Sequence, residues 1–278
     1  MLEFQFNEFL SPDRENTNMI PKKIHYCWFG KGKYPPIVKK CINSWKKVMP
    51  DYELKLWNED CFDINSITYM KKCYEMRKWA FISDYVRLYA LYNDGGIYLD
   101  TDVMALKSFD SLLDCNAFWG LEAIAEENYV FPESGVFGTV KKFHILEEIM
   151  DYYHQLDEYN ITSDDFARLC NCTSLENRTI YKNDGSIQLV TAPVAIEDTL
   201  RKYGFKNEIR NQVLKEDIRI WAEPIIQNHQ KIDTPETIAH HLNDSSWFFT
   251  DRGPFFKFCH NHPFWIPVYK KIEKITSK

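Results

Sequence analysis

The order of apolar and polar positions predicts that strands and helices alternate from about residue 21 onward. The apolar run "KKIHYCWFG" at 22–30 predicts a buried strand that ends in a glycine turn. The segment "PPIVKKCINSWKKVMP" at 35–50 has the spacing of an amphipathic helix that begins at a proline pair and ends before another proline. "YELKLW" at 52–57 alternates as a second strand. This strand–helix–strand order predicts a parallel sheet with right-handed crossovers.

The middle of the chain predicts a long helix followed directly by a third strand. Residues 69–92 are strongly helical in pattern, and Asn93-Asp94-Gly95-Gly96 is a helix-stop sequence. Residues 141–215 are also mainly helical, and we expect them to form a lid or an acceptor-side insertion. The later strand-like runs are "GGIYLDTDV" at 95–103, "AFWGLEA" at 117–123, "ESGVFGTV" at 133–140, "IRIWAEPIIQ" at 218–227 and "ETIAHHL" at 236–242.

Composition indicates a folded chain with a large core. Of the 278 residues, 45% are hydrophobic and 15% are aromatic, which argues against disorder. We expect residues 1–20 to form a polar N-terminal arm and residues 21–278 to form a single domain. The formal net charge of −6 gives no reason to expect a nucleic-acid partner. None of the eight cysteines forms a Cys-x-x-Cys pair, so we expect reduced thiols and no structural zinc site.

The lengths of the apolar runs also indicate where in the cell the protein is expected. Residues 1–20 are polar, and no apolar run approaches the ~18 residues that indicate a membrane span. We therefore expect a cytoplasmic protein with at most a peripheral association at the inner face of the membrane.

Two carboxylates at the end of the third predicted strand are the clearest candidates for chemistry. Asp100 and Asp102 are two residues apart, so a continuous strand would place both on one face, at its carboxyl end. Ligands of open α/β sheets bind at that edge, and all-oxygen ligation suits Mg²⁺ or Mn²⁺. The plain alternative for an isolated Asp-x-Asp is a solvated strand end.

The preceding helix adds a second pair of charges. "WAFISDYVRLYALY" at 79–92 is apolar nearly all round, as a buried helix is. Asp84 and Arg87 are three residues apart and so share a face of this helix. They could form a structural ion pair. Beside a metal-bound diphosphate, Asp84 could instead accept sugar hydroxyls and Arg87 could bind a phosphate oxygen.

Together these segments resemble the bacterial capsular-polysaccharide members of glycosyltransferase family 32, and more distantly the glucosyltransferase domains of clostridial toxins. The resemblance is carried by "IPKKIHYCWFG", "INSWKKVMPDYELKLWNED", "FISDYVRLYALYNDGGIYLDTDV" and a late "HHLNDSSW". It implies a GT-A fold, an α/β architecture with a mostly parallel central sheet flanked by helices and a helical insertion. It also implies retaining transfer of a hexose from a nucleotide sugar, expected to be a UDP-sugar, with Mn²⁺ or Mg²⁺ as cofactor. The implied acceptor is a saccharide or lipid-linked glycan in the synthesis of surface polysaccharide or other glycans.

The resemblance implies roles for individual residues on the donor side. Trp28, next to Cys27, resembles the tryptophan that stacks on uracil, although a core aromatic is its plain alternative. Asp84 and Arg87 match a Ser-Asp-x-x-Arg motif that holds the donor sugar and the diphosphate. Tyr98 precedes the acidic pair where the family has an aromatic residue.

It also implies roles for the acidic pair and for a closing segment. Asp100 is expected to reach the ribose and sugar hydroxyls, and Asp102 to bind the metal directly. Ser246 and Trp247 resemble the Ser-Trp that covers the diphosphate. These expectations make Asp84, Arg87, Asp100 and Asp102 the expected catalytic residues.

The second protein ligand of the metal is open between His240 and His241. Relatives often have three residues between His-His and Ser-Trp, and this chain has one more. Strand alternation sends the two imidazoles to opposite faces, so they should differ. We favour His241 slightly, because it is nearer the closing segment, and Asp244 is an alternative ligand. A second departure is Ala192, where relatives commonly have Gly before a proline on the acceptor side.

Two other functions fit parts of the pattern. "IYLDTDV" also fits the motif of haloacid-dehalogenase-like phosphatases, in which the first Asp is a nucleophile. That motif belongs near the start of its domain, whereas here about ninety residues precede it. The other alternative is a non-catalytic module that binds a nucleotide sugar.

Overall fold

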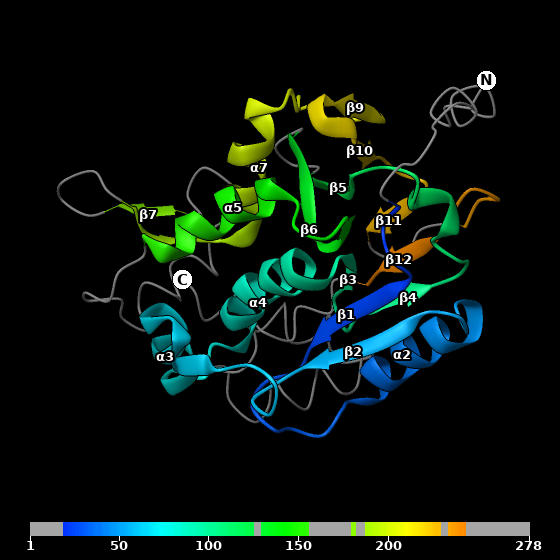
Figure 1. Ribbon diagram of the computed structural model, residues 1–278. Helices are drawn as coiled ribbons and strands as arrows, with labels where there is room; N and C mark the ends of the chain where they lie inside the picture. Colours follow the sequence, from blue (N-terminus) through cyan, green and yellow to red (C-terminus); the bar gives the residue numbers. More distant parts are fainter. Residues whose placement is uncertain (1–18, 125–128, 156–178, 182–186, 229–232, 243–278) are drawn as a thin grey trace, which may run out of the picture. The chain divides into compact units, whose positions relative to one another are not determined.

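The computed structural model describes residues 19–124, 129–155, 179–181, 187–228 and 233–242 (Figure 1). The chain divides into two compact units, residues 1–243 and 244–278, and every described residue lies in the first. The predicted N-terminal arm lies outside the described residues except at Met19 and Ile20, and Ile20 is buried in the core. Among the described residues, no helix combines the length and the apolar character needed to cross a membrane.

The helices and strands follow the predicted alternation. The helices are α2 (Pro36–Val48), α3 (Thr68–Glu75), α4 (Trp79–Asp94), α5 (His144–His154) and α7 (Ala192–Lys202), with single 3-10 turns at Ile64–Ser66, Asp110–Leu112 and Lys215–Asp217. The strands are β1 (Lys23–Cys27), β2 (Glu53–Trp57), β3 (Gly96–Leu99), β4 (Val103–Ala105), β5 (Ala117–Ile124), β6 (Tyr129–Thr139), β7 (Thr179–Tyr181), β8 (Ile187–Val190), β9 (Gln212–Leu214), β10 (Ile218–Trp221), β11 (Ile226–Asn228) and β12 (Ala239–His241).

A seven-stranded sheet forms the centre of this unit, in the order β2-β1-β3-β6-β5-β10-β9. β1 pairs in parallel with β2 and β3, as the strand–helix–strand start predicts. β6 runs antiparallel to both β3 and β5, while β10 is parallel to β5 and antiparallel to β9. Five strands therefore share one direction and only β6 and β9 oppose it, which confirms a mixed α/β fold with a mostly parallel sheet.

A second, three-stranded sheet begins directly after the Asp100–Asp102 segment and contains His240 and His241. Its order is β11-β12-β4, and β4 pairs antiparallel with β12. Trp45 of α2 donates its indole N–H to the Val103 carbonyl at 2.8 Å, which ties β4 to the core. Figure 1 shows the β12 and β4 ribbons next to each other, near β3.

The helix stop before β3 is confirmed and depends on one glycine. Gly95 has φ +67° and donates its N–H to the Leu91 carbonyl at 2.7 Å. A Cβ at this position would lie 2.7 Å from the backbone nitrogen of Lys141. The positive φ and this close approach both favour glycine, and they fix where β3 starts.

Four predicted boundaries were wrong. The helix predicted over 69–92 is two helices, because Arg77 adopts φ +58° between α3 and α4. The strand predicted over 218–227 is split into β10 and β11, which belong to different sheets. The strand predicted over 236–242 is limited to β12, and the single strand predicted over 95–103 is β3 and β4 with a turn between them. In the two strand runs that are divided, 95–103 and 218–227, the pairing partner changes within the run, and apolar spacing does not record partners.

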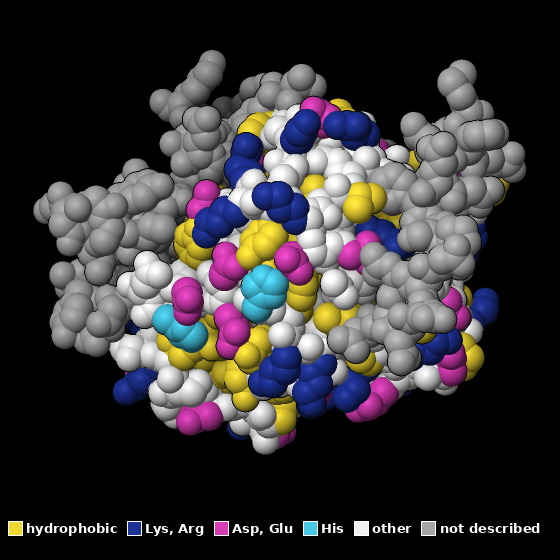
Figure 2. Space-filling view, turned by 45° about the horizontal axis from the view of Figure 1, so that its top comes forward, with side chains coloured by type: hydrophobic (Ala, Val, Ile, Leu, Met, Phe, Trp, Pro, Cys, Tyr) yellow, Lys and Arg dark blue, Asp and Glu magenta, His cyan; other side chains and the backbone are white. Residues whose placement is uncertain are grey.

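The predicted helical insertion is only partly described. Within 141–215, α5 and α7 are helices, but the β7–β8 pair and β9 add strands, and residues 156–178 lie outside the described set. On the face in Figure 2, Lys and Arg side chains are interspersed with acidic side chains and histidines. The Lys202–Glu148 pair, at 3.8 Å, joins an exposed lysine to a half-buried glutamate and is of the surface kind that contributes little to stability.

Candidate metal and sugar-nucleotide site

The two carboxylates of the Asp-x-Asp motif lie in a turn between β3 and β4, so the prediction that one continuous strand places both on the same face was wrong. The Asp100 N–H donates to the Gly135 carbonyl at 2.8 Å, which continues the pairing of β3 with β6. The Val103 N–H then donates to the Asp100 carbonyl at 3.0 Å and closes the turn. The chain leaves the main sheet here because β4 pairs with β12 instead.

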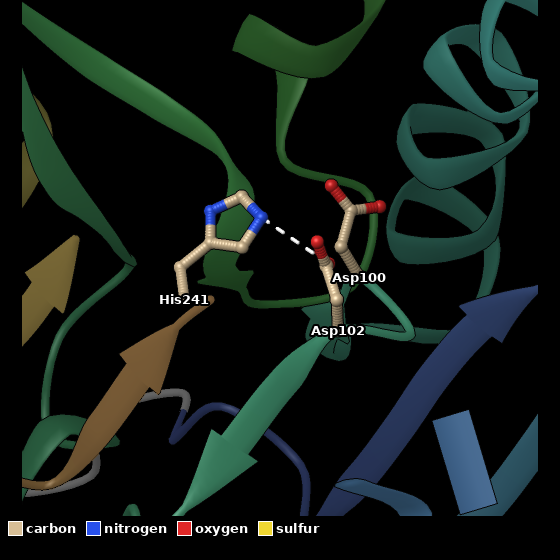
Figure 3. Close-up of side chains that lie close together, drawn as sticks. All are labelled: Asp100, Asp102 and His241. Atoms are coloured by element: carbon tan, nitrogen blue, oxygen red, sulfur yellow. Dashed lines mark ion pairs between the residues drawn. The ribbon is translucent and has the colours of Figure 1, made fainter. Parts of the chain in front are cut away.

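His241 joins the two carboxylates from the end of β12. One ligand atom each from Asp100, Asp102 and His241 can be chosen so that all lie within 4.8 Å of one another. The His241 Nε2 atom lies 3.3 Å from Asp102 Oδ1, and Figure 3 shows the imidazole facing the two carboxylates. The pairing of His241 with Val103 across the β12–β4 ladder sets this approach.

His240 lies in a different environment. Its Nε2 contacts a carboxylate oxygen of Asp233, and its side chain is buried. The structure therefore brings His241, and not His240, to Asp100 and Asp102. Ser246, Trp247 and the alternative ligand Asp244 lie outside the described residues.

A buried carboxylate that the sequence reasoning missed contacts the other side of His241. Glu133 is in β6, and its side chain is 1% exposed. Its Oε1 contacts His241 Nδ1. Burial disfavours the charged imidazolium, but Glu133 and Asp102 outweigh this effect and raise the pKa of His241 well above its ordinary value. The available signal was a single acidic residue inside the apolar run "YVFPESGVFG".

Arg87 connects the helix pair to the acidic turn. Its Nη2 lies 3.0 Å from Asp84 Oδ1, and its Nη1 lies 3.5 Å from Asp100 Oδ2. The Nη1 group also donates to the Ser134 carbonyl at 2.6 Å, and Nε donates to the Ser83 carbonyl at 3.0 Å. The guanidinium is therefore fixed in position, and it orders both carboxylates.

Burial and charge act in opposite directions on this pair. Burial raises the pKa of Asp84 to about 6, although Arg87 opposes the shift. Burial alone would lower the pKa of Arg87, but the negative charge of Asp100 leads the contributions that raise it, so the guanidinium stays charged. The predicted pair is therefore real, and it extends to Asp100 as well.

Tyr98 and Cys27 line the same region. The Tyr98 hydroxyl donates to Asp100 Oδ1 at 2.9 Å, and its ring lies 4.7 Å from the Arg87 guanidinium carbon. Cys27 is buried, and burial raises the pKa of its thiol to about 12. A neutral, buried thiol is a packing group rather than a nucleophile.

Trp28 follows β1, the strand next to β3. Its indole N–H donates to the Gly32 carbonyl at 2.7 Å, and its ring meets Tyr34 edge-on at 5.0 Å between centroids. The side chain is half-buried, so it is not simply a core aromatic. Because β1 and β3 are parallel neighbours, Trp28 and Asp100 follow the carboxyl ends of adjacent strands.

The segment that begins α7 also reaches the site. The Ala192 N–H, at the start of α7, donates to Asp84 Oδ2 at 3.4 Å. The departure from relatives at Ala192 therefore lies against a residue predicted to hold the donor sugar.

The donor set fits a divalent cation. An octahedral ion with ligands at about 2.1 Å separates neighbouring ligand atoms by about 3 Å. The 3.3 Å between His241 Nε2 and Asp102 Oδ1 is close to that spacing. Two carboxylates and one imidazole suit Mn²⁺ and also permit Mg²⁺.

Residues 35–119 match the family described as "Glycosyltransferase sugar-binding region containing DXD motif". The chain is 34% identical over 101 residues to inositol phosphoceramide mannosyltransferase 3 of Schizosaccharomyces pombe, which covers 34% of this chain and 27% of the relative. It is 38% identical over 99 residues to an uncharacterized protein of Arabidopsis thaliana, which covers 34% of this chain and 13% of that one. Each match therefore spans about a quarter or less of the relative's own length.

Among solved structures, the PaToxG glycosyltransferase is similar over 66% of this chain and 70% of its own, at 17% identity and a TM-score of 0.45. The matched family region contains Asp84, Arg87, Tyr98, Asp100 and Asp102, whereas Glu133 and His241 lie beyond it. The sequence matches support a glycosyltransferase, and residues 35–119 are similar to the DXD-containing sugar-binding region of that class of enzyme.

Proposed function

We propose that this chain is a metal-dependent, retaining glycosyltransferase that moves a hexose from a nucleotide sugar to a saccharide acceptor. The observation that carries the proposal is the approach of Asp100, Asp102 and His241 to within 4.8 Å, two of them inside the matched sugar-binding region. The ordered Asp84–Arg87–Asp100 contacts beside these ligands support it further.

In this proposal, Asp102 and His241 hold the cation, and Asp100 contacts both the cation site and the donor. A bound Mn²⁺ or Mg²⁺ would act as a Lewis acid that stabilises the departing nucleoside diphosphate. Arg87 contributes a fixed positive charge next to the same leaving group. Asp84, whose pKa is raised to about 6, accepts hydroxyls of the donor sugar.

We further propose that the donor is a UDP-sugar whose base stacks on Trp28. The half-buried ring leaves part of its surface available for a base. Tyr98 would help to shape the donor site through its contacts with Asp100 and Arg87, and the buried Cys27 at the end of β1 would pack beneath it. The predicted closing residues Ser246 and Trp247 would cover the diphosphate and exclude water.

The proposed acceptor is a saccharide or a lipid-linked glycan. We propose that it enters the site near the start of α7, where the Ala192 N–H donates to Asp84. The relative named as an inositol phosphoceramide mannosyltransferase makes a phosphoinositol lipid acceptor and a mannosyl donor worth testing. A role in the synthesis of surface polysaccharide, peripheral attachment to a membrane and a single domain over 21–278 remain proposals from the sequence.

The two alternative functions predict different behaviour. A haloacid-dehalogenase-like phosphatase would place its nucleophile near the start of its domain, whereas Asp100 follows β3, after two strands and three helices. A binding module would retain donor affinity without turnover. The family match favours the transferase over both alternatives.

A donor screen tests the proposal. Thermal unfolding would be followed with Mn²⁺ and a panel of UDP-hexoses, with GDP-mannose included for comparison. A ligand at 100 times its dissociation constant should add about 2.7 kcal/mol to the free energy of unfolding. We expect at least one UDP-sugar to stabilise the protein in Mn²⁺ and to do so less after chelation. No stabilisation by any nucleotide sugar in Mn²⁺ would contradict the proposal.

A further inference from the structure

The imidazole of His241 lies between two carboxylates from different parts of the chain. Its Nδ1 contacts Oε1 of Glu133 on β6, and its Nε2 lies 3.3 Å from Oδ1 of Asp102. The side chain of His241 is 10% exposed and that of Glu133 is 1% exposed. Water therefore has little access to the contact between them, and the ring has little freedom to turn.

Glu133 is expensive to keep as a carboxylate at this position. Its Oε2 atom is buried and has no hydrogen-bond partner among the residues that the structure describes. A buried acceptor without a partner costs free energy, and a buried charge costs more. Packing alone would be served better by an apolar side chain or an amide. The contact with Nδ1 of His241 is an interaction that a carboxylate makes more strongly than an amide or an apolar side chain.

Two glycines, Gly120 and Gly135, leave space for the side chains of Glu133 and His241. A Cβ on Gly120 would lie 3.0 Å from Oε2 of Glu133. A Cβ on Gly135 would lie 3.1 Å from Oε1 of Glu133 and 2.7 Å from Cε1 of His241. Larger residues at either glycine would press on the carboxylate or the ring.

We propose that Glu133 is a positioning residue that orients His241 for the divalent cation. Glu133 accepts the Nδ1–H of His241. When a cation takes the place of the Nε2 proton, the proton on Nδ1 stays with Glu133, so the tautomer is fixed and the Nε2 lone pair is presented to the cation beside Asp102. This inference rests on the proposed function, in which Nε2 is a ligand of the cation. Among the described residues, the group that could hold a cation is Asp100, Asp102 and His241, and Glu133 contacts the ring nitrogen of His241 opposite to Asp102, so we place its effect on the cation through the imidazole.

Direct metal binding tests this assignment without any catalytic assay. Free Mn²⁺ would be measured by its electron paramagnetic resonance signal during titration of the full chain in the presence of UDP. Glu133→Gln keeps the shape of the side chain and removes its charge. We expect Mn²⁺ affinity to fall about 10- to 100-fold, the usual effect of losing the partner of a metal-bound histidine.

The matched control is Glu197→Gln. Glu197 of α7 is also a buried carboxylate, and its partners are Tyr129 and Arg201 rather than His241. Its replacement should change stability but leave Mn²⁺ affinity at the wild-type value. If Glu133→Gln does not fold, Glu133→Asp keeps the charge but shortens the reach, and the same loss of affinity is expected.

A double-mutant cycle distinguishes positioning from a general effect on structure. His241→Ala should weaken Mn²⁺ binding by itself, and adding Glu133→Gln to it should produce no further loss, because Glu133 acts through the ring. Wild-type affinity in Glu133→Gln, or fully additive losses in the double variant, would overturn the role of Glu133 alone. Unchanged affinity in His241→Ala would instead overturn the proposed metal site.

Discussion

His241 Nε2 lies 3.3 Å from Asp102 Oδ1, although the two residues come from distant parts of the chain. The backbone creates this proximity, because β12 pairs antiparallel with β4 and sets His241 opposite Val103. The Leu242 N–H also donates to the Asp102 carbonyl at 3.1 Å. The candidate ligands are therefore positioned by strand pairing before any cation binds.

The two adjacent histidines should respond differently to replacement. His241→Ala should raise the Mn²⁺ concentration needed for half-maximal activity at least ~10-fold, because it removes a ligand. His240→Ala should leave the metal requirement unchanged and lower the melting temperature, because the imidazole is buried against Asp233. Activity titrated with Mn²⁺, together with melting curves, checks both. Two variants with identical metal curves would rule out the assignment of His241.

Gly135 should be intolerant of a single added methyl group. A Cβ there would lie 2.7 Å from Asp100 Oδ2 and 2.7 Å from His241 Cε1. Gly135→Ala should displace both side chains while the fold persists, and activity should fall about 10²-fold, as small misplacements in active sites cause. Gly32→Ala is the control, because a Cβ there meets nothing within 4 Å. Equal activity in the two variants would show that the site is not tightly packed.

Trp28→Ala separates base stacking from core packing. If the ring stacks on uracil, the variant should lose about 1–3 kcal/mol of UDP binding free energy and keep most of its stability. A core role predicts about 3–5 kcal/mol of lost unfolding free energy instead. UDP affinity by calorimetry and melting temperature should be measured on one preparation. Unchanged affinity with a much lower melting temperature would assign Trp28 to the core.

His25 should make stability depend on pH. Burial lowers the pKa of His25 from 6.5 to about 4. The ring donates from Nε2 to the Gly95 carbonyl at 2.9 Å and accepts the Trp57 indole N–H at Nδ1, also at 2.9 Å, so the neutral form is satisfied on both sides. Because the pKa is depressed in the folded state, its contribution is complete above pH 6.5 and is lost as the pH falls from 6.5 to about 4.

The full contribution corresponds to about 3 kcal/mol of unfolding free energy. Urea unfolding at several pH values between 7 and 4 measures it. His25→Gln cannot take up the proton, so its stability should fall less over the same range, although its stability at pH 7 should also be lower. Parallel pH profiles for the two proteins would contradict the burial of a neutral imidazole.

Local signals predicted much of the fold. The β1–α2–β2 unit and the Gly95 stop before β3 follow from apolar spacing and from glycine and proline positions, which act within a few residues. The Asp84–Arg87 contact was also predictable, because residues three apart on a helix share a face.

Other features depended on partners that lie far away in the sequence. The turn at Asp100–Asp102 exists because β4 pairs with β12, and nothing in the run "IYLDTDV" signals that change. The register between β12 and β4 decides which histidine lies next to Asp102, and the sequence does not show that register. Glu133 was not predicted as a site residue, because a single acidic residue in an apolar strand is not a motif. Its contact with His241 is what gives it a candidate role.

The most direct test of the central claim is release of nucleoside diphosphate from the stabilising UDP-sugar, measured with Mn²⁺ and with excess chelator. We predict turnover in Mn²⁺, none in chelator, and a loss of at least ~10²-fold in Asp102→Asn, a typical result of removing one charge-stabilising group. Asp60→Asn, at an exposed position, should match the wild type. Full turnover in chelator or in Asp102→Asn would contradict a metal site built on Asp100, Asp102 and His241.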